Sequence, residues 1–132
     1  MTRYVIEPGA ALELAKREAA IPPRHKLLAP TLLRSQVLAQ LYAQVMRGEL
    51  TRADATRRMD YLRGLQMRLL GDRVLQRVAW DMAQELEWND TLDAEYLALT
   101  KLQADALVTV NTGLARAARK LVTVASLDDL LG

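Results

Sequence analysis

The sequence predicts an α/β protein: a three-layer α/β/α domain around a central, mostly parallel sheet of four to five short strands. Three observations predict this class. Apolar runs of three to five residues, which suit buried strands, alternate with longer segments whose apolar residues recur at helical spacing. Proline, glycine and capping residues separate the two kinds of segment. The length of 132 residues is that of one domain, which we expect to cover residues 1–132.

The first part of the chain is expected to contain two strands and one helix. Residues 4–6 form a β-like run, which Glu7-Pro8-Gly9 interrupts. Residues 10–20 have helical character and end at a proline pair. Residues 27–29 form a second short strand, closed by Pro30. A helix between two strands favours parallel pairing, because it carries the chain back across the sheet.

Two helices are expected next. The first covers residues 31–47, with Thr31 as its N-cap and a glycine after its end. Its apolar residues recur at helical spacing: Leu33, Val37, Leu41 and Val45. The second begins at Thr51, has Asp54 three residues later as a partial capping box, and ends near residue 64.

The second half of the chain continues the alternation. We expect a strand at 67–70, a helix at 72–86, a turn with a cap at 89–91, a helix at 92–103, a strand at 106–110, a helix at 112–119, a strand at 121–124 and a capped turn at 126–131. The five strands should therefore form one sheet with helices on both faces.

The composition excludes several kinds of site. There is no cysteine, which rules out disulfides, thiolate metal sites and cysteine nucleophiles. The single histidine, His25, rules out a multi-histidine site, and we expect it in an exposed loop. The sequence has no long uncharged apolar stretch and no leader pattern, so we expect a cytoplasmic protein with no membrane contact. Trp80 and Trp88 are expected in the core or at an interface.

Charge is unevenly distributed. The net charge is only +2, but residues 47–77 carry eight arginines and four acids, whereas residues 78–105 carry seven acids and one lysine. The arginines could bind RNA phosphates. Their spacing of five turns successive residues onto different helix faces, so a solvated surface with local ion pairs is the preferred interpretation.

Four polar residues are expected at one edge of the sheet. Ligands of open parallel sheets bind beyond the carboxyl ends of the strands, where helix N-termini also point. Glu7 and Asn111 directly follow predicted strands, and Gln36 and Asp93 lie early in predicted helices. Taken singly, each has a structural alternative as a turn residue, a helix-start acid or an exposed helix residue.

Four segments then occur in a recognisable order: Tyr4-Val5-Ile6-Glu7, residues 28–37 (LAPTLLRSQV), residues 92–99 (LDAEYLAL) and residues 106–114 (ALVTVNTGL). They resemble the PIN-domain family, and more narrowly the VapC toxins of bacterial toxin–antitoxin pairs. The corresponding family patterns are a first strand ending in Asp, Ala-Pro-x-Leu-Leu-x-x-Glu-Val, Asp-Ala-x-Tyr-x-Ala-Leu-Ala and Leu-Val-Thr-x-Asp-x-x-Leu.

The resemblance implies a metal-dependent endoribonuclease whose ring of acids holds Mg²⁺ or Mn²⁺. The ion activates water and stabilises the charge that develops on the phosphate. Only Asp93 matches the family pattern, and Glu7 keeps the charge on a longer side chain. Both are expected as catalytic and metal-binding residues. Gln36 and Asn111 stand where the family has Glu and Asp, as degenerate site positions, so two charges replace four and metal affinity should fall. The two amides fit either drift into a binding role or deliberate inactivation.

Two interpretations of function follow, with an unrelated α/β scaffold as a minor third. In the first, the chain is a current or former Mg²⁺- or Mn²⁺-dependent endoribonuclease of a toxin–antitoxin pair. In the second, which the amides favour, it is a non-catalytic PIN-like module that binds an antitoxin-like partner, a second copy or RNA. By resemblance, both imply a homodimer, and a toxin would have a small VapB-like antitoxin.

Overall fold

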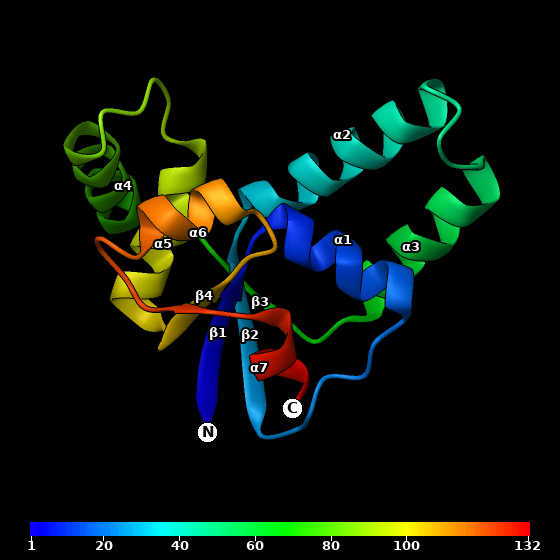
Figure 1. Ribbon diagram of the computed structural model, residues 1–132, viewed down its shortest axis with the longest axis horizontal. Coiled ribbons are helices and arrows are strands. Elements are labelled where there is room, and N and C mark those ends of the chain that lie inside the picture. The colour runs from blue at the N-terminus through cyan, green and yellow to red at the C-terminus, as the bar shows by residue number, and fades with distance from the viewer.

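The computed structural model describes residues 1–132 and contains one five-stranded, all-parallel sheet (Figure 1). The strand order is β3-β2-β1-β4-β5, which puts the first strand at the centre. The strands are β1 (Thr2–Ile6), β2 (His25–Pro30), β3 (Arg68–Leu70), β4 (Ala106–Val108) and β5 (Val124–Ala125). The prediction of an α/β protein with a central sheet of four to five short strands is confirmed.

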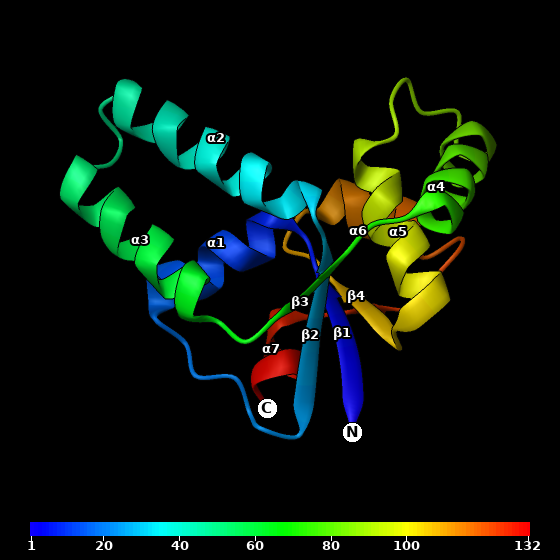
Figure 2. The same cartoon turned by 180° about the vertical axis from the view of Figure 1, so that it is seen from behind.

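Seven helices surround the sheet. They are α1 (Pro8–Arg17), α2 (Leu32–Met46), α3 (Arg52–Gly64), α4 (Arg73–Glu85), α5 (Leu92–Gln103), α6 (Thr112–Ala118) and α7 (Leu127–Leu131). Helix α5 packs on β1, β2 and β4 and carries α4 on its outer side, while α1 lies on the other face with α2 and α3 against it (Figures 1 and 2). The arrangement is a three-layer α/β/α fold.

The core lies between the sheet and these helix layers. Its largest completely buried side chains come from β1, β4, α1, α2, α5 and α7: Ile6, Leu14, Leu33, Leu41, Tyr96, Leu97, Leu99, Leu107 and Leu130. The chain order reverses between β1 and β4, since β2 and β3 lie on one side of β1, and β4 and β5 on the other. This reversal makes the carboxyl ends of β1 and β4 the expected place for a site.

Helix α1 begins and ends earlier than predicted. The expected helix covered residues 10–20, but the helix starts at Pro8, because Glu7 caps it, and ends at Arg17. Glu18 adopts a left-handed conformation with φ of 49°, and its N–H donates to the carbonyls of Leu14 and Ala15. This geometry terminates the helix before the proline pair is reached.

Two predicted strand boundaries are also wrong. The strand expected at 106–110 ends at Val108, because its partner Ile6 is the last residue of β1 and the chain of β1 then turns into α1. The strand expected at 121–124 is mostly a turn: the N–H groups of Leu121 and Val122 both donate to the carbonyl of Ala118. Only Val124 and Ala125 pair with β4.

Two expected caps and the expected environment of His25 differ in detail. Thr31 and Thr91 precede their helices but make no side-chain cap. His25 lies in β2 rather than in an exposed loop: its Nδ1 is 2.7 Å from the carbonyl oxygen of Leu130 in α7. Trp80 is 66% exposed on α4, so it is not a core residue, whereas Trp88 packs against the core. None of the helices combines the length and hydropathy needed to cross a membrane.

Candidate functional site

The first site residue, Glu7, serves as the N-cap of α1. It directly follows β1, as predicted, and is 5% exposed. Its Oε1 accepts the N–H of Ala10 at 2.6 Å, and its Oε2 accepts the N–H of Gly9 at 3.0 Å. A third, longer bond of 3.4 Å comes from the N–H of Val110, beyond β4. The carboxylate therefore links the start of α1 to the β4–α6 connection, and both of its oxygens accept backbone N–H groups.

Gly9 allows this carboxylate to fold back onto the helix. A Cβ at position 9 would lie 2.9 Å from Oε1 of Glu7 and 3.0 Å from Cγ2 of Val110. Real Cβ atoms do not approach that closely, so a larger residue would displace the carboxylate or the β4–α6 connection. The sequence Glu7-Pro8-Gly9 thus encodes a capped turn, with proline in the first turn of the helix, where no N–H partner is needed.

The second site residue, Gln36, is bound by a buried tyrosine. The hydroxyl of Tyr96 on α5 donates to Oε1 of Gln36 on α2 at 2.5 Å. The Tyr96 side chain is completely buried. Burial raises the pKa of its hydroxyl far above the usual range, and the negative charges of Glu7, Glu95 and Asp93 raise it further. The phenol is therefore a permanent donor to Gln36, and these three carboxylates lie within electrostatic reach of it.

The third site residue, Asn111, caps α6. Its Oδ1 accepts the N–H of Leu114 at 2.9 Å. Its own N–H donates to Oγ1 of the buried Thr109 at 3.0 Å. Asn111 comes three residues after β4, rather than directly after it, but the bond from Val110 to Glu7 keeps this connection beside the end of β1.

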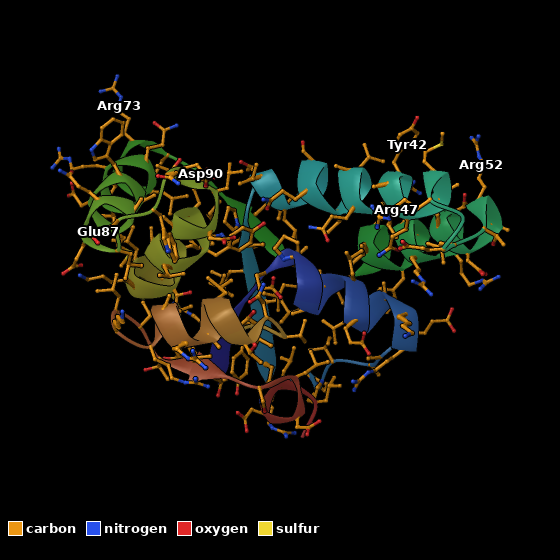
Figure 3. The ribbon with its side chains drawn as sticks, turned by 45° about the horizontal axis from the view of Figure 1, so that its top comes forward. Tyr42, Arg47, Arg52, Arg73, Glu87 and Asp90 are labelled. Atoms are coloured by element: carbon orange, nitrogen blue, oxygen red, sulfur yellow. The ribbon has the colours of Figure 1, made fainter.

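The fourth site residue, Asp93, is the one whose carboxylate is free. It lies in the first turn of α5, is partly exposed, and forms no hydrogen bond or ion pair through its side chain. Partial burial raises the pKa of its carboxyl, and the negative charge of Asp90 raises it further. Asp90 lies on the connection between α4 and α5 (Figure 3). Its Oδ1 accepts the N–H of Leu92, so it supplies the helix-start bond expected from Thr91.

The four predicted positions therefore lie at the carboxyl edge of the sheet, but their side-chain oxygens differ in whether they accept a hydrogen bond from this chain. Glu7, Gln36 and Asn111 each accept a hydrogen bond from this chain, and only Asp93 does not. No three acidic or histidine side chains come together as a metal-binding group. No buried side-chain nitrogen or oxygen lacks a partner. The donor set of this edge, two carboxylates and two amides that are mostly bonded internally, does not fit the four-acid ring that the resemblance implies for a catalytic divalent cation.

Sequence reasoning missed one residue and one surface. Tyr96 lies within the helix predicted at 92–103, but nothing in the sequence indicates that it binds Gln36, 60 positions earlier. The missed surface is a groove of 510 Å³ between α2 and α3, whose lining includes none of the four predicted site residues. Eight of its ten lining residues are apolar, and Leu38 is 56% exposed there. Its two cationic residues are Arg34, which forms no ion pair, and Arg63, which pairs with Asp60.

The arginine-rich stretch does not form one surface. Its residues are distributed over the α2–α3 connection, α3, β3 and α4. Three of them make local ion pairs with acids two or three positions away in the sequence: Arg47 with Glu49, Arg57 with Asp54 and Arg63 with Asp60. The structure thus agrees with the expectation of a solvated surface with local ion pairs.

Comparison with known proteins bears on the fold. A scan against protein-family models finds no match, and a search of curated proteins finds none either. Among solved structures, the chain is similar to the crystal structure of PAE2754 from Pyrobaculum aerophilum, with a TM-score of 0.79. The match covers 98% of this chain and 93% of that chain at 21% sequence identity. At that identity the likeness establishes the three-layer fold alone.

Proposed function

We propose that this chain is a PIN-like domain related to the VapC toxins, that its carboxyl-edge site has lost metal-dependent ribonuclease chemistry, and that it works by binding a protein partner. The observation that carries this proposal is the internal bonding of Glu7, Gln36 and Asn111. A catalytic divalent cation requires several oxygen ligands with enough negative charge to offset its loss of water. Here two of the four positions are neutral, and one of the two charges serves as a helix cap.

The groove between α2 and α3 supports the binding half of the proposal. Its lining is mostly apolar, and an exposed apolar groove of this kind is typical of a helix-binding surface. Arg34 at its border has no ion-pair partner within the chain. We therefore propose as occupant a helical segment of an antitoxin-like protein, with leucine-like anchors and acidic residues beside them.

A ribonuclease assay tests the loss of catalysis. The wild-type protein is incubated with a structured RNA in Mg²⁺ and then in Mn²⁺, beside the double variant Gln36→Glu/Asn111→Asp. We expect no cation-dependent cleavage by the wild type and a gain of cleavage in the double variant, because two charges return to the edge. Cation-dependent cleavage by the wild type that Asp93→Asn abolishes would contradict the proposal.

Co-expression tests the partner. The chain is produced together with any small protein encoded next to its gene, and a complex is purified through a tag on this chain. Leu38→Glu places a charge in the groove and should release the partner. Tyr42→Glu is the matched control, because Tyr42 is 65% exposed on the same helix, outside the groove lining (Figure 3). Equal retention in both variants would show that the groove is not the contact.

A second candidate function, residual divalent-cation binding, is favoured by one observation at Asp93. Its free carboxylate lies beside Asp90, whose charge opposes its ionisation. A cation there would relieve this repulsion, and Mg²⁺ can bind through one or two carboxylates with water completing its shell. Such a site would preserve part of the nuclease interpretation, with Asp93 as the ligand and Glu7 as its structural neighbour.

A further inference from the structure

A cluster of cations lies at the opposite edge of the sheet, near the amino ends of the strands. Arg3 of β1 pairs in register with Lys26 of β2, and Leu28 of β2 pairs with Arg68 of β3. Alternate residues of a strand share a face, so Arg3, Lys26 and Arg68 project from the same face of three neighbouring strands. All three are exposed.

These cations have no partner within the chain. None of them takes part in an ion pair, although the four ion pairs of the molecule all involve other arginines. Asp105 is close to Arg3, but its carboxylate accepts the backbone N–H of Arg3 at 2.8 Å and does not pair with the guanidinium. Like charges directly opposite each other on paired strands destabilise a sheet, so the juxtaposition of Arg3 and Lys26 is unfavourable unless an anion lies between them.

The cluster opens into a hollow of 760 Å³ that contains no acidic residue in its lining. Its volume lies within the range of small-molecule sites. The connections before β2 and before β3 contribute apolar residues to the lining, among them Ile21, Pro22 and Leu65. The hollow therefore combines three cations with apolar side chains, which suits a ligand that carries both a phosphate group and an apolar part.

We infer that this hollow binds a phosphorylated ligand of nucleotide size, with its phosphate oxygens at Arg3, Lys26 and Arg68 and its apolar part against Ile21 and Leu65. Arginine suits this role because its planar donors match phosphate oxygens, and lysine adds a compact charge. The site is separate from the carboxyl edge, so this inference does not depend on the proposed loss of nuclease chemistry.

The experiment measures binding of sodium tripolyphosphate and of ATP to the full chain at low ionic strength, by calorimetry and by thermal shift. We expect saturable binding and a rise in the melting temperature, since a ligand of the native state stabilises it. Lys26→Gln and Arg68→Gln should each weaken binding about tenfold, equivalent to about 1.4 kcal/mol. Without ligand, Lys26→Gln should melt at or above the wild-type temperature, because it removes the opposed charge.

Arg52→Gln is the matched control, since it removes one positive charge at the start of α3, whereas only the last residue of that helix, Gly64, lines the hollow. Arg52 is labelled in Figure 3. The affinity of Arg52→Gln should equal that of the wild type. An equal loss in Arg52→Gln and Arg68→Gln, or no binding by the wild type, would overturn the inference. The last measurement is the affinity for a single-stranded 12-nucleotide RNA. An affinity for this RNA more than tenfold higher than for ATP would overturn the inference that the ligand is of nucleotide size, and would indicate that the cations bind a polynucleotide.

Discussion

Replacing Glu7 with alanine removes a carboxylate that accepts three backbone N–H groups. Two of these bonds, from Ala10 at 2.6 Å and Gly9 at 3.0 Å, have normal hydrogen-bond lengths, and the third, from Val110, is long. A hydrogen bond to a charged group stabilises a fold by about 1.5–3 kcal/mol, and loss of an N-cap costs up to about 2 kcal/mol. The two figures describe overlapping interactions, so we expect a loss of about 3 kcal/mol for this buried cap.

The assay is urea unfolding followed by circular dichroism at neutral pH, without divalent cations. A loss of about 3 kcal/mol corresponds to a melting temperature about 12 °C lower for a domain of this size. Glu7→Gln keeps one acceptor oxygen and should lose about 1 kcal/mol. Glu13→Ala is the control on the same helix: its ion pair with Arg17 is largely exposed, so the change should stay below about 0.5 kcal/mol.

The opposite result would have a clear meaning. A carboxylate kept for a metal ion, rather than for capping, repels its neighbours when the ion is absent, so its removal would leave the free energy of unfolding unchanged or higher. Stability of Glu7→Ala equal to or above that of the wild type would therefore show that Glu7 is not a structural cap.

Four further predictions concern the same molecule. Tyr96→Phe should lower the free energy of unfolding by about 1 kcal/mol, because it leaves Oε1 of Gln36 without its donor; a thermal melt unchanged from the wild type would contradict this. Asp90→Asn should lower the pKa of Asp93 in an NMR titration while leaving it above the ordinary value of 3.8, since burial is the larger cause. Because the native pKa of Asp93 is raised, its ionisation should lower the free energy of unfolding as the pH rises from about 3.8 through the native pKa. If Asp93→Asn left the pH dependence of the free energy of unfolding unchanged over this range, the prediction would be wrong. Ser126→Ala should cost about 1 kcal/mol in urea unfolding, because it opens the capping box at the start of α7, and no change would show that this last turn contributes nothing to stability.

The fold could be predicted because its determinants are local. Short apolar runs and capping residues mark most elements, and Asp72 and Ser126 do cap the helices that follow them. In two places where the prediction failed, a distant contact decided the outcome. The strand expected at 106–110 is shortened by the turn after its partner in β1, and His25 is held in β2 beside α7, 105 positions away.

The site could be predicted only as a location. The rule for parallel sheets correctly brought Glu7 to the end of β1 and placed the other three polar residues near the same edge. The sequence could not show that Tyr96 binds Gln36 or that Val110 reaches Glu7, because those bonds depend on packing between separate elements. The groove could not be predicted from the sequence either, since it forms only when α2 and α3 lie side by side.

Titration with Mn²⁺, followed by paramagnetic broadening of backbone NMR signals, decides whether the carboxyl edge holds a divalent cation. The internal bonding of Glu7, Gln36 and Asn111 predicts no saturable broadening near Asp93 at millimolar Mn²⁺. The double variant Gln36→Glu/Asn111→Asp should gain a saturable site. Saturable broadening in the wild type that disappears in Asp93→Ala would contradict the proposed loss of metal chemistry and restore the ribonuclease interpretation.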